Sequence, residues 1–356
     1  MTALSNRYVT LQKESAYGVE LVPATTKLFL GEVDDESFSQ NFDLLTRADI
    51  SRYGASKTVA GLFYGEGDVN LPLQLDDFNS FCLFSAFGVD GFDSATTPNT
   101  HTLTETLDDA DFASFTARIG MEELEHTYPG MVLDSLSLSA NVGEYVMMTY
   151  SFVGCGETAV SALTVPGAVA SDSPPAFGTL DALHFAKAYV SFESLATDSN
   201  FSKLVKSVSL EITLNRDTDN ASALGGSTYL VSPPPQLREI TGTLELNTGN
   251  DLASGTPETD NTPTYEELRG FLLHNGTALL PALMLRFEDS ATPPNFFEIK
   301  VPKVAYEAPE MNLSGRDTTT LSMNFVGLFD ETAGYMATAV IGMDGINGGA
   351  AMTKTP

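Results

Sequence analysis

The sequence predicts a β-rich α+β protein with two tandem antiparallel β-sandwich domains, each with one helix packed on a sheet. Two observations lead to this prediction. Several segments alternate apolar and polar residues, as half-buried strands do, and four segments recur in the same order in both halves. The matched segments are residues 57–64 with 238–245, 76–88 with 264–276, 115–119 with 283–287, and 150–154 with 323–327. The recurrence indicates one ancestral unit present twice in 356 residues.

The expected domain boundaries follow from this repeat and from local composition. The first copy covers residues 1–157 and the second covers residues 184–331. Between them, residues 158–183 are rich in Ala, Ser and Pro, which is typical of a linker. Residues 332–356 are rich in Gly, Ala and Met and have no counterpart in the first copy. We expect this last segment to be a C-terminal arm that packs on another subunit, or a frayed tail.

The strands are expected where apolar residues recur at every second position. Residues 208–215 and 321–325 alternate without a break, so one face of each strand points to a core and the other to water or a polar partner. Other expected strands follow the same pattern less cleanly. They are residues 7–11, 38–44, 148–152 and 184–192.

One helix is expected in each copy. In the first, Asp76 is a suitable N-cap, apolar residues follow at helical spacing, and Gly88 is a suitable stop. In the second, residues 264–276 begin with a Thr-x-x-Glu capping box and end on Gly276. Each helix can therefore cover one side of a sheet.

Charge is the most unusual property of the composition. Asp and Glu number 47 against 18 Lys and Arg, a net charge of −29, and the acidic residues are spread through both halves. Such a surface repels itself unless salt screens it, which favours a host that lives at high salt. An acidic surface protein of an ordinary host is the alternative. Gripping a nucleic-acid duplex is disfavoured, because that needs a basic face.

Two further features narrow the class of protein. No segment has 18 continuous apolar residues, and no apolar stretch follows Arg7, so neither a membrane span nor a signal peptide is predicted. The two cysteines, Cys82 and Cys155, have apolar neighbours, and we expect buried free thiols rather than a disulfide.

A search for catalytic and metal-binding motifs finds none that predicts an enzyme, a cofactor or a metal site. The four histidines are scattered, and no Walker loop or Gly-x-Ser-x-Gly elbow is present. Residues 65–68, Gly-Glu-Gly-Asp, are interpreted as a turn rather than a binding loop. Residues 90–93 lack the ligand series of a calcium loop, so a solvated loop is expected. Paired carboxylates are expected by chance among so many acidic residues.

Several segments resemble a known family. Residues 7–18, Arg-Tyr-Val-Thr-Leu-Gln-Lys-Glu-Ser-Ala-Tyr-Gly, resemble the start of tail tube (major tail) proteins of tailed phages and tailed archaeal viruses, which often open with a strand and a Glu-Ser-x-Tyr-Gly turn. Residues 36–38 and 209–212 are similar to that family's serine-bearing first sheet strand, and residues 238–245 to its strand before the helix. The resemblance spans roughly residues 8–329. The linker and the C-terminal segment fall outside it.

The resemblance implies a structural virion protein that assembles with itself. Each copy would be a tube-like domain, and three duplicated chains would form a pseudo-sixfold ring, as in a siphovirus tail. Rings would stack around a channel for viral DNA, with other tail proteins at the tube ends, no membrane and assembly in the host cytoplasm. Two long polar excursions, residues 43–57 and 217–237, are candidates for contacts between rings.

The resemblance also implies which residues face the channel. Polar faces of the strands would line it, and their short neutral or acidic side chains present no cation to a passing phosphate. The candidates are Ser137, Ser139, Thr149, Ser151, Ser209, Glu211, Thr213, Ser322 and Asn324. The apolar faces, which would sit under the helix, are Leu210, Ile212, Leu214, Met323 and Phe325. Alternation alone equally predicts polar faces that only meet solvent.

Two other classes of protein remain as alternatives. A non-tail β-sandwich module, such as a capsid decoration protein or an adhesin-like binding protein, would share the strand pattern. A glycoside-active enzyme would need two poised carboxylates and aromatic platforms, and the absence of Trp disfavours it.

Overall fold

The structure is a computed structural model of the whole chain. It describes residues 7–21, 28–48, 51, 53–106, 112–164, 181–192, 205–219, 221–222, 229–247, 282–307, 310–312 and 320–354. Pairings between the named strands are all antiparallel. The β-rich α+β class predicted from the sequence is therefore confirmed, whereas the duplication stays a prediction.

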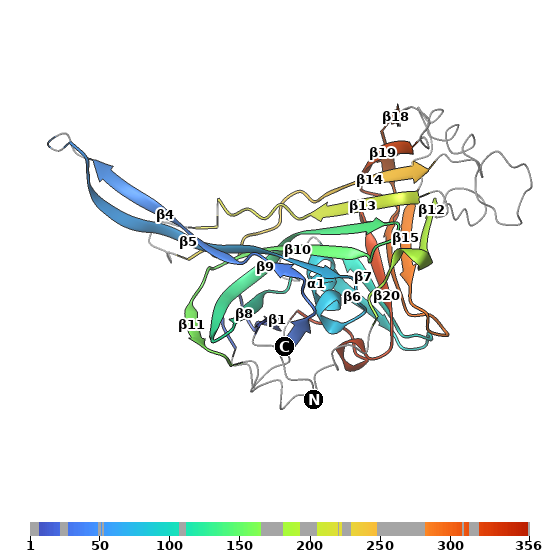
Figure 1. Cartoon of the computed structure of the whole chain (residues 1–356), viewed down its shortest axis with the longest axis horizontal. Coiled ribbons are helices and arrows are strands. Elements are labelled where there is room, and N and C mark those ends of the chain that lie inside the picture. Colours follow the sequence, from blue (N-terminus) through green and yellow to red (C-terminus); the bar gives the residue numbers. More distant parts are fainter. Residues whose placement is uncertain are drawn as a thin grey trace, which may run out of the picture.

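The larger sheet has 14 strands, and a continuous path of strands crosses it (Figure 1). The path runs through β17 (Val304–Tyr306), β19 (Thr320–Gly327), β14 (Glu239–Asn247), β13 (Val205–Thr213), β9 (Leu124–Asn141), β10 (Met147–Gly154), β5 (Ala55–Pro72) and β3 (Asp35–Glu36). Strands beside this path are β1 (Arg7–Lys13), β2 (Leu28–Gly31), β4 (Ser39–Ala48), β8 (Phe115–Met121), β11 (Ala159–Ala162) and β18 (Glu310–Asn312). Strand β9 is long enough to pair with β10 and β13 at one end and with β8 and β11 at the other.

The second sheet has six strands and combines both halves of the sequence. Its order is β12 (Ala188–Phe192), β15 (Leu283–Glu288), β16 (Phe296–Val301), β20 (Thr338–Gly342), β7 (Thr100–Glu105) and β6 (Gly88–Asp93). Before β12, a 3-10 turn, η2 (Phe185–Lys187), occupies the start of the segment expected to be strand. The two sheets share one apolar core, which includes Leu210 and Leu244 from the larger sheet and Phe297 and Ile341 from the smaller.

The helix expected in the first half is confirmed as α1 (Asp77–Phe87). Asp76 caps it by accepting a hydrogen bond from the backbone N–H of Asn79 at 2.8 Å. It ends at Gly88, whose φ of +98° suits a residue without a Cβ. The helix packs against β2, β7 and β9. The helix expected at residues 264–276 lies outside the described residues.

The C-terminal segment differs from the expected arm or tail. Residues 338–342 form β20, which pairs with β16 on one side and β7 on the other, within its own chain. A second 3-10 turn, η5 (Ile346–Gly348), follows, and the Met352 N–H donates to Asp90 at 2.7 Å. The apolar and β-branched residues of β20 complete the smaller sheet, which explains why the segment folds back.

Two loops predicted from the sequence are strands in the structure. Residues 65–68 lie in the middle of β5, and a Cβ on Gly65 would lie 2.9 Å from the backbone of Gly156, so these glycines allow close packing rather than a turn. Residues 90–93 belong to β6, where buried Asp90 accepts a hydrogen bond from, or donates one to, His101 Nδ1 at 2.8 Å. Cys82 and Cys155 are free and buried, as predicted.

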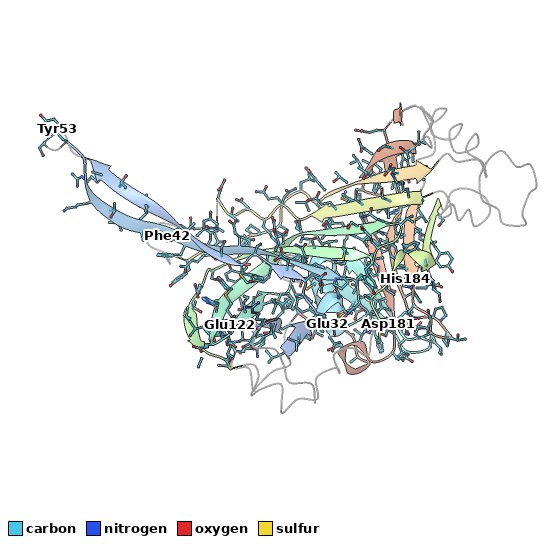
Figure 2. All side chains as sticks on the ribbon, in the orientation of Figure 1. Glu32, Phe42, Tyr53, Glu122, Asp181 and His184 are labelled. Atoms are coloured by element: carbon cyan, nitrogen blue, oxygen red, sulfur yellow. The ribbon has the colours of Figure 1, made fainter. Side chains whose placement is uncertain are left out.

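Strands β4 and β5 extend into a hairpin that projects from the rest of the molecule (Figure 1). Figure 2 shows Tyr53 at its tip and Phe42 nearer to the body. The excursion expected at residues 43–57 is therefore a two-stranded arm, and we call residues 42–63 the hairpin arm. Its exposed apolar side chains are Phe42, Leu44, Leu45, Tyr53 and Val59.

Candidate functional site

The larger sheet has one buried face and one polar face. On β13, Val208, Leu210 and Ile212 are buried, whereas the residues between them are at least partly accessible. The same alternation holds on β19 and β14. Directly paired residues of antiparallel strands point to the same side, so the pairing registers decide which side chains share a face. All five apolar residues expected on the core side are buried. They are Leu210, Ile212, Leu214, Met323 and Phe325.

The nine channel-lining candidates all lie on the polar face. Across the sheet, Thr149 is opposite Ser137, which is opposite Glu211. A second row has Ser151 and Thr213 on either side of Ser135. The remaining four candidates lie in two further rows across the sheet. Ser139, Ser209 and Asn324 belong to the row that passes through Thr243, and Ser322 belongs to the row that passes through Glu245. Their pairings are Ser139 with Ser209, Ser209 with Thr243, Thr243 with Asn324, and Glu245 with Ser322.

Strands β14 and β5 add residues to this face that the sequence analysis did not include. They are Glu239, Thr241, Thr243 and Glu245 from β14, and Glu66, Asp68 and Asn70 from β5. On β14, the polar residues alternate with the buried Ile240, Leu244 and Leu246, and this pattern in the sequence could have identified them as part of the same face. We name the accessible side chains of β5, β10, β9, β13, β14 and β19 on this side the polar face.

The polar face is acidic. Glu66, Asp68, Glu211 and Glu239 are exposed carboxylates on it. Lys206 contacts the face but is engaged by Glu245, with 3.0 Å between Nζ and Oε1. The hydrogen bond from Lys206 lowers the pKa of Glu245 below its ordinary value, so this carboxylate is ionised at neutral pH. The arrangement therefore repels anions such as phosphate.

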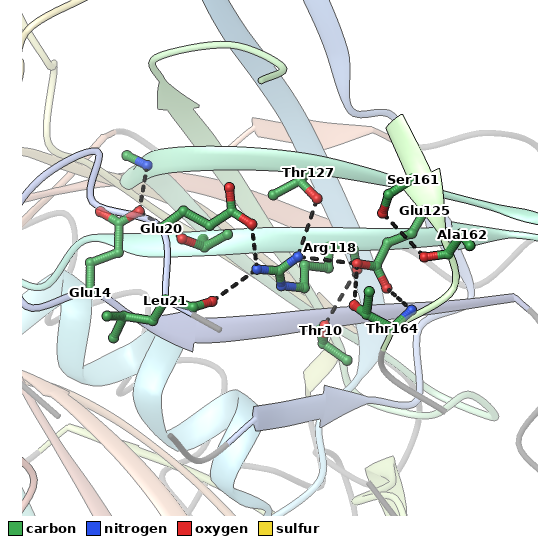
Figure 3. A network of polar contacts seen from close by, with 12 residues as sticks. Thr10, Glu14, Glu20, Leu21, Arg118, Glu125, Thr127, Ser161, Ala162 and Thr164 are labelled. Atoms are coloured by element: carbon green, nitrogen blue, oxygen red, sulfur yellow. Dashed lines mark hydrogen bonds and ion pairs between the residues drawn. The ribbon is translucent and has the colours of Figure 1, made fainter. Parts of the chain in front are cut away.

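A buried polar network lies behind this face, around β1, β8 and β9 (Figure 3). The Arg118 guanidinium donates to Glu20 at 2.8 Å, to the carbonyl of Leu21 at 2.9 Å and to Glu125 at 3.1 Å. Burial raises the pKa of Glu125, but hydrogen bonds from Thr164 and Tyr8 and the charge of Arg118 lower it overall. The network holds the segment after β1 against the sheet.

The turn after β1 is held by a single carboxylate. Buried Glu14 accepts hydrogen bonds from the Ser114 and Thr116 hydroxyls, both at 2.8 Å, and from the backbone N–H groups of Gly130 at 2.8 Å and Gly18 at 2.9 Å. Glu14 and Gly18 are the first and last residues of the Glu-Ser-x-Tyr-Gly pattern. The motif is thus structural, because its acid satisfies four donors inside the protein.

Most of the chain matches the model of a known protein family. Residues 5–327 match the family described as phage tail tube protein. The chain belongs to the phage tail tube protein family. It is therefore a structural protein of the virion tail. A comparison with curated proteins found no match.

Two other kinds of feature were sought in the part of the chain that the structure describes, a metal cluster and a membrane-spanning helix. Among the described residues, no three His, Cys, Asp or Glu side chains are grouped so that they could hold a metal ion. The described helix is too short to cross a membrane, and none of the described residues forms one that could. The polar face is the candidate functional site.

Proposed function

We propose that this tail tube protein is the major tail tube subunit and assembles into rings of three chains, stacked around a channel through which viral DNA passes. The polar face lines the channel. Family membership supports a tube. The observation that carries the proposal is the alignment of all nine sequence-derived candidates on one acidic face of a continuous sheet.

Charge supports the assignment of the polar face to the channel. Proteins bind nucleic acid largely by neutralising phosphates with Lys and Arg, which releases counterions. The exposed carboxylates of Asp68, Glu211 and Glu239 do the opposite, because they repel phosphate at short range. Transient passage requires that DNA does not adhere, and hydroxyl and carboxylate side chains meet this requirement.

The hairpin arm supports stacking of the rings. Leu44 and Leu45 are each 62% exposed and Val59 is 65% exposed, on a hairpin in which β4 pairs with β5. Burial of such side chains against a neighbour is favourable by about 1.5–3 kcal/mol each. We propose that the hairpin arm contacts the adjacent ring, as does the segment 217–237, in which Leu237 is 76% exposed.

Other parts of the proposal concern the surroundings of the tube. Other tail proteins cap its ends, assembly takes place in the host cytoplasm, and the virion is of the siphovirus type. The net charge of −29 supports a host that lives at high salt. The two tube-like copies, residues 1–157 and 184–331, would then place six similar units around a ring of three chains.

Electron microscopy of the purified chain tests the proposal. In about 2 M salt, where charges are screened within a few ångströms, we expect rings or tubes with a central hole. A reconstruction should place Glu211 and Thr149 on the wall of the hole. Monomers at every salt concentration, or a hole lined by the other face of the sheet, would contradict the proposal.

A further inference from the structure

The hairpin arm differs in charge from the rest of the chain. Residues 42–63 include three basic and two acidic residues, so the arm has a net charge of +1. Since the whole chain has 18 basic and 47 acidic residues, the remainder has 15 basic and 45 acidic ones, a net charge of −30. The arm is therefore a net cationic projection from a strongly acidic body (Figure 1).

Two of the basic residues lie directly opposite each other on the arm. Arg47 of β4 pairs with Lys57 of β5, and two residues nearer to the body Leu45 pairs with Val59. Paired residues of antiparallel strands, and residues two apart on one strand, point to the same side. These four residues are all exposed, and we call their side of the arm the cationic face. The pairs on the opposite side carry no charge.

The cationic face is unfavourable for an isolated chain, because like charges directly opposite each other destabilise a pair of strands. Among the ion pairs of the described residues, none includes Arg47 or Lys57. Other cations in the described part of the chain pair with a carboxylate. They are Arg7, Arg118, Lys206, Arg238 and Arg286. Within the described residues, the cationic face thus lacks the compensating acids that these cations have.

We infer that the cationic face binds carboxylates on the body of a second copy of this chain. The inference rests on the contact between rings proposed above and names the chemistry of that contact. The Arg47 guanidinium can hold a carboxylate through two parallel hydrogen bonds, and the Lys57 ammonium adds a second positive charge beside it. A second copy supplies the acids, because its body has a net charge of −30 when the arm is left out of the 47 acidic and 18 basic residues.

A second copy fits the cationic face better than other partners do. Two acidic bodies repel each other, so a contact between copies needs a local attraction of opposite charges. The arm and the body are different surfaces of one molecule, and such a heterologous contact can repeat along an axis, as stacked rings require. A nucleic-acid duplex is held by many phosphate contacts, for which two cations between apolar residues are too few.

The apolar residues of the cationic face allow the contact to persist at high salt. Charges that stay exposed are screened within about 3 Å at 1 M salt, whereas buried pairs are screened much less. Burial of Leu45 and Val59 against the second copy removes water from the neighbouring cations. The effective dielectric constant falls there, so each ion pair becomes stronger than it would be on an open surface.

A cross-linker without a spacer tests the contact. A water-soluble carbodiimide joins a Lys amine to a touching carboxylate as an amide. In tubes of mixed isotope-labelled and unlabelled full chains, we expect mass spectrometry to find Lys57 of one chain joined to an Asp or Glu of another, outside residues 42–63. Lys206 and Glu245, with 3.0 Å between Nζ and Oε1 in one chain, are the positive control. Lys57→Arg keeps the charge, so its tubes should form normally and lack this cross-link.

Reversal of one charge separates binding from a merely structural role. Lys57→Glu places an acid opposite Arg47, so the free energy of unfolding should rise or stay constant. The concentration needed for tube formation should nevertheless rise at least about tenfold, because the acidic body of the second copy then meets an acid. Arg7→Glu is the matched control, since it changes the net charge equally at an exposed residue of β1. It should assemble like the unmodified chain.

The outcomes separate this inference from the proposed function. Tubes that form normally from Lys57→Glu would overturn the inference and leave the tube intact. The same holds if Lys57 is joined to no carboxylate of another chain although Lys206 reacts. Duplex DNA that binds the unmodified chain but not Lys57→Glu would assign the cationic face to nucleic acid and overturn the inference as well. Monomers of the unmodified chain at every salt concentration would overturn both the inference and the proposed function.

Discussion

The carboxylate of Glu14 accepts a hydrogen bond from the backbone N–H of Gly18, 2.9 Å away. Gly18 has a φ of +71°, in the left-handed region that favours glycine, and a Cβ there would lie 3.2 Å from Cys155 Sγ. The acid and the glycine thus define a tight turn that ends β1 and returns the chain to the sheet. The spacing of the motif follows from this contact.

Replacing Glu14 with Ala should destabilise the protein by about 3 kcal/mol, because three buried donors and one partly buried donor lose their acceptor. The free energy of unfolding, measured in urea, checks this expectation. Ser15→Ala, in the same turn but exposed, should change it by less than about 0.5 kcal/mol. Equal effects of the two substitutions would show that the turn does not depend on the carboxylate.

Asp76 should make stability depend on pH. Burial raises its pKa to about 6, even though hydrogen bonds from Asn79 lower it. The folded state therefore binds this proton more tightly than the unfolded state, and the contribution of Asp76 is most favourable below pH 3.8 and is lost as the pH rises through 6. Asp76→Asn keeps an oxygen for the helix cap.

We therefore expect Asp76→Asn to be more stable than the unmodified protein by about 2 kcal/mol at pH 7.5, with the difference vanishing near pH 4. Thermal or urea unfolding at several pH values measures it. Asp76→Ala, which removes the cap, provides the comparison and should lose about 1 kcal/mol relative to the Asn variant. A pH-independent difference between Asp and Asn would refute the assigned pKa.

Polar substitutions on the hairpin arm should impair assembly and spare folding. Leu44→Ser with Leu45→Ser removes two exposed apolar side chains, so the unfolding free energy should change by less than about 0.5 kcal/mol. The concentration needed for tube formation should rise at least about tenfold, because each leucine loses about 1.5–3 kcal/mol of burial against a neighbour. Sedimentation and electron microscopy measure the assembled fraction.

Val160→Ser is the matched control for the hairpin arm, because Val160 is 52% exposed on β11, away from the arm. It should assemble normally. If the double leucine variant formed tubes of ordinary length and yield, the hairpin arm would not be part of the contact between rings.

Salt should stabilise the monomer. A net charge of −29 on one chain repels itself at low ionic strength, and the Debye length falls from about 10 Å at 0.1 M to about 3 Å at 1 M. The midpoint of thermal unfolding should rise by several degrees between 50 mM and 2 M NaCl. Sucrose at equal osmolarity is the control, because it is excluded from the protein surface but does not screen charge. Equal shifts of the unfolding midpoint in NaCl and in sucrose would show that the stabilisation does not come from charge screening.

The parts of the fold that could be predicted are those decided by local patterns. Strands β13 and β19 alternate apolar and polar residues because one face is buried and the other is not. The helix α1 carries its own start and stop signals at Asp76 and Gly88. The polar face was predictable for the same reason, since strand alternation determines which side chains share a side once the strands are adjacent.

The misinterpreted segments depend on distant neighbours. Gly65 and Gly67 are typical of a turn, but they lie in β5 because Gly156 and Phe38 pack against them. Asp90 looked solvent-exposed because its partner His101 is on the next strand. In each case the deciding contact is made by a residue that local composition does not indicate.

Strand β14 was predicted as a strand from the family resemblance of residues 238–245, but its contribution to the polar face was not predicted. The face of a strand is apparent from alternation, whereas its position in a sheet depends on the pairing order. The placement of β14 between β13 and β19 is a long-range property of the chain.

The smaller sheet draws β6 and β7 from the first half and its other four strands from the second, with β20 from the chain end beside β7. A polypeptide that stops after the first half would expose one side of β7, and one that begins after it would expose β20. Each half therefore supplies a strand edge that the other half covers, so truncation to either half should expose backbone groups that are paired in the whole chain.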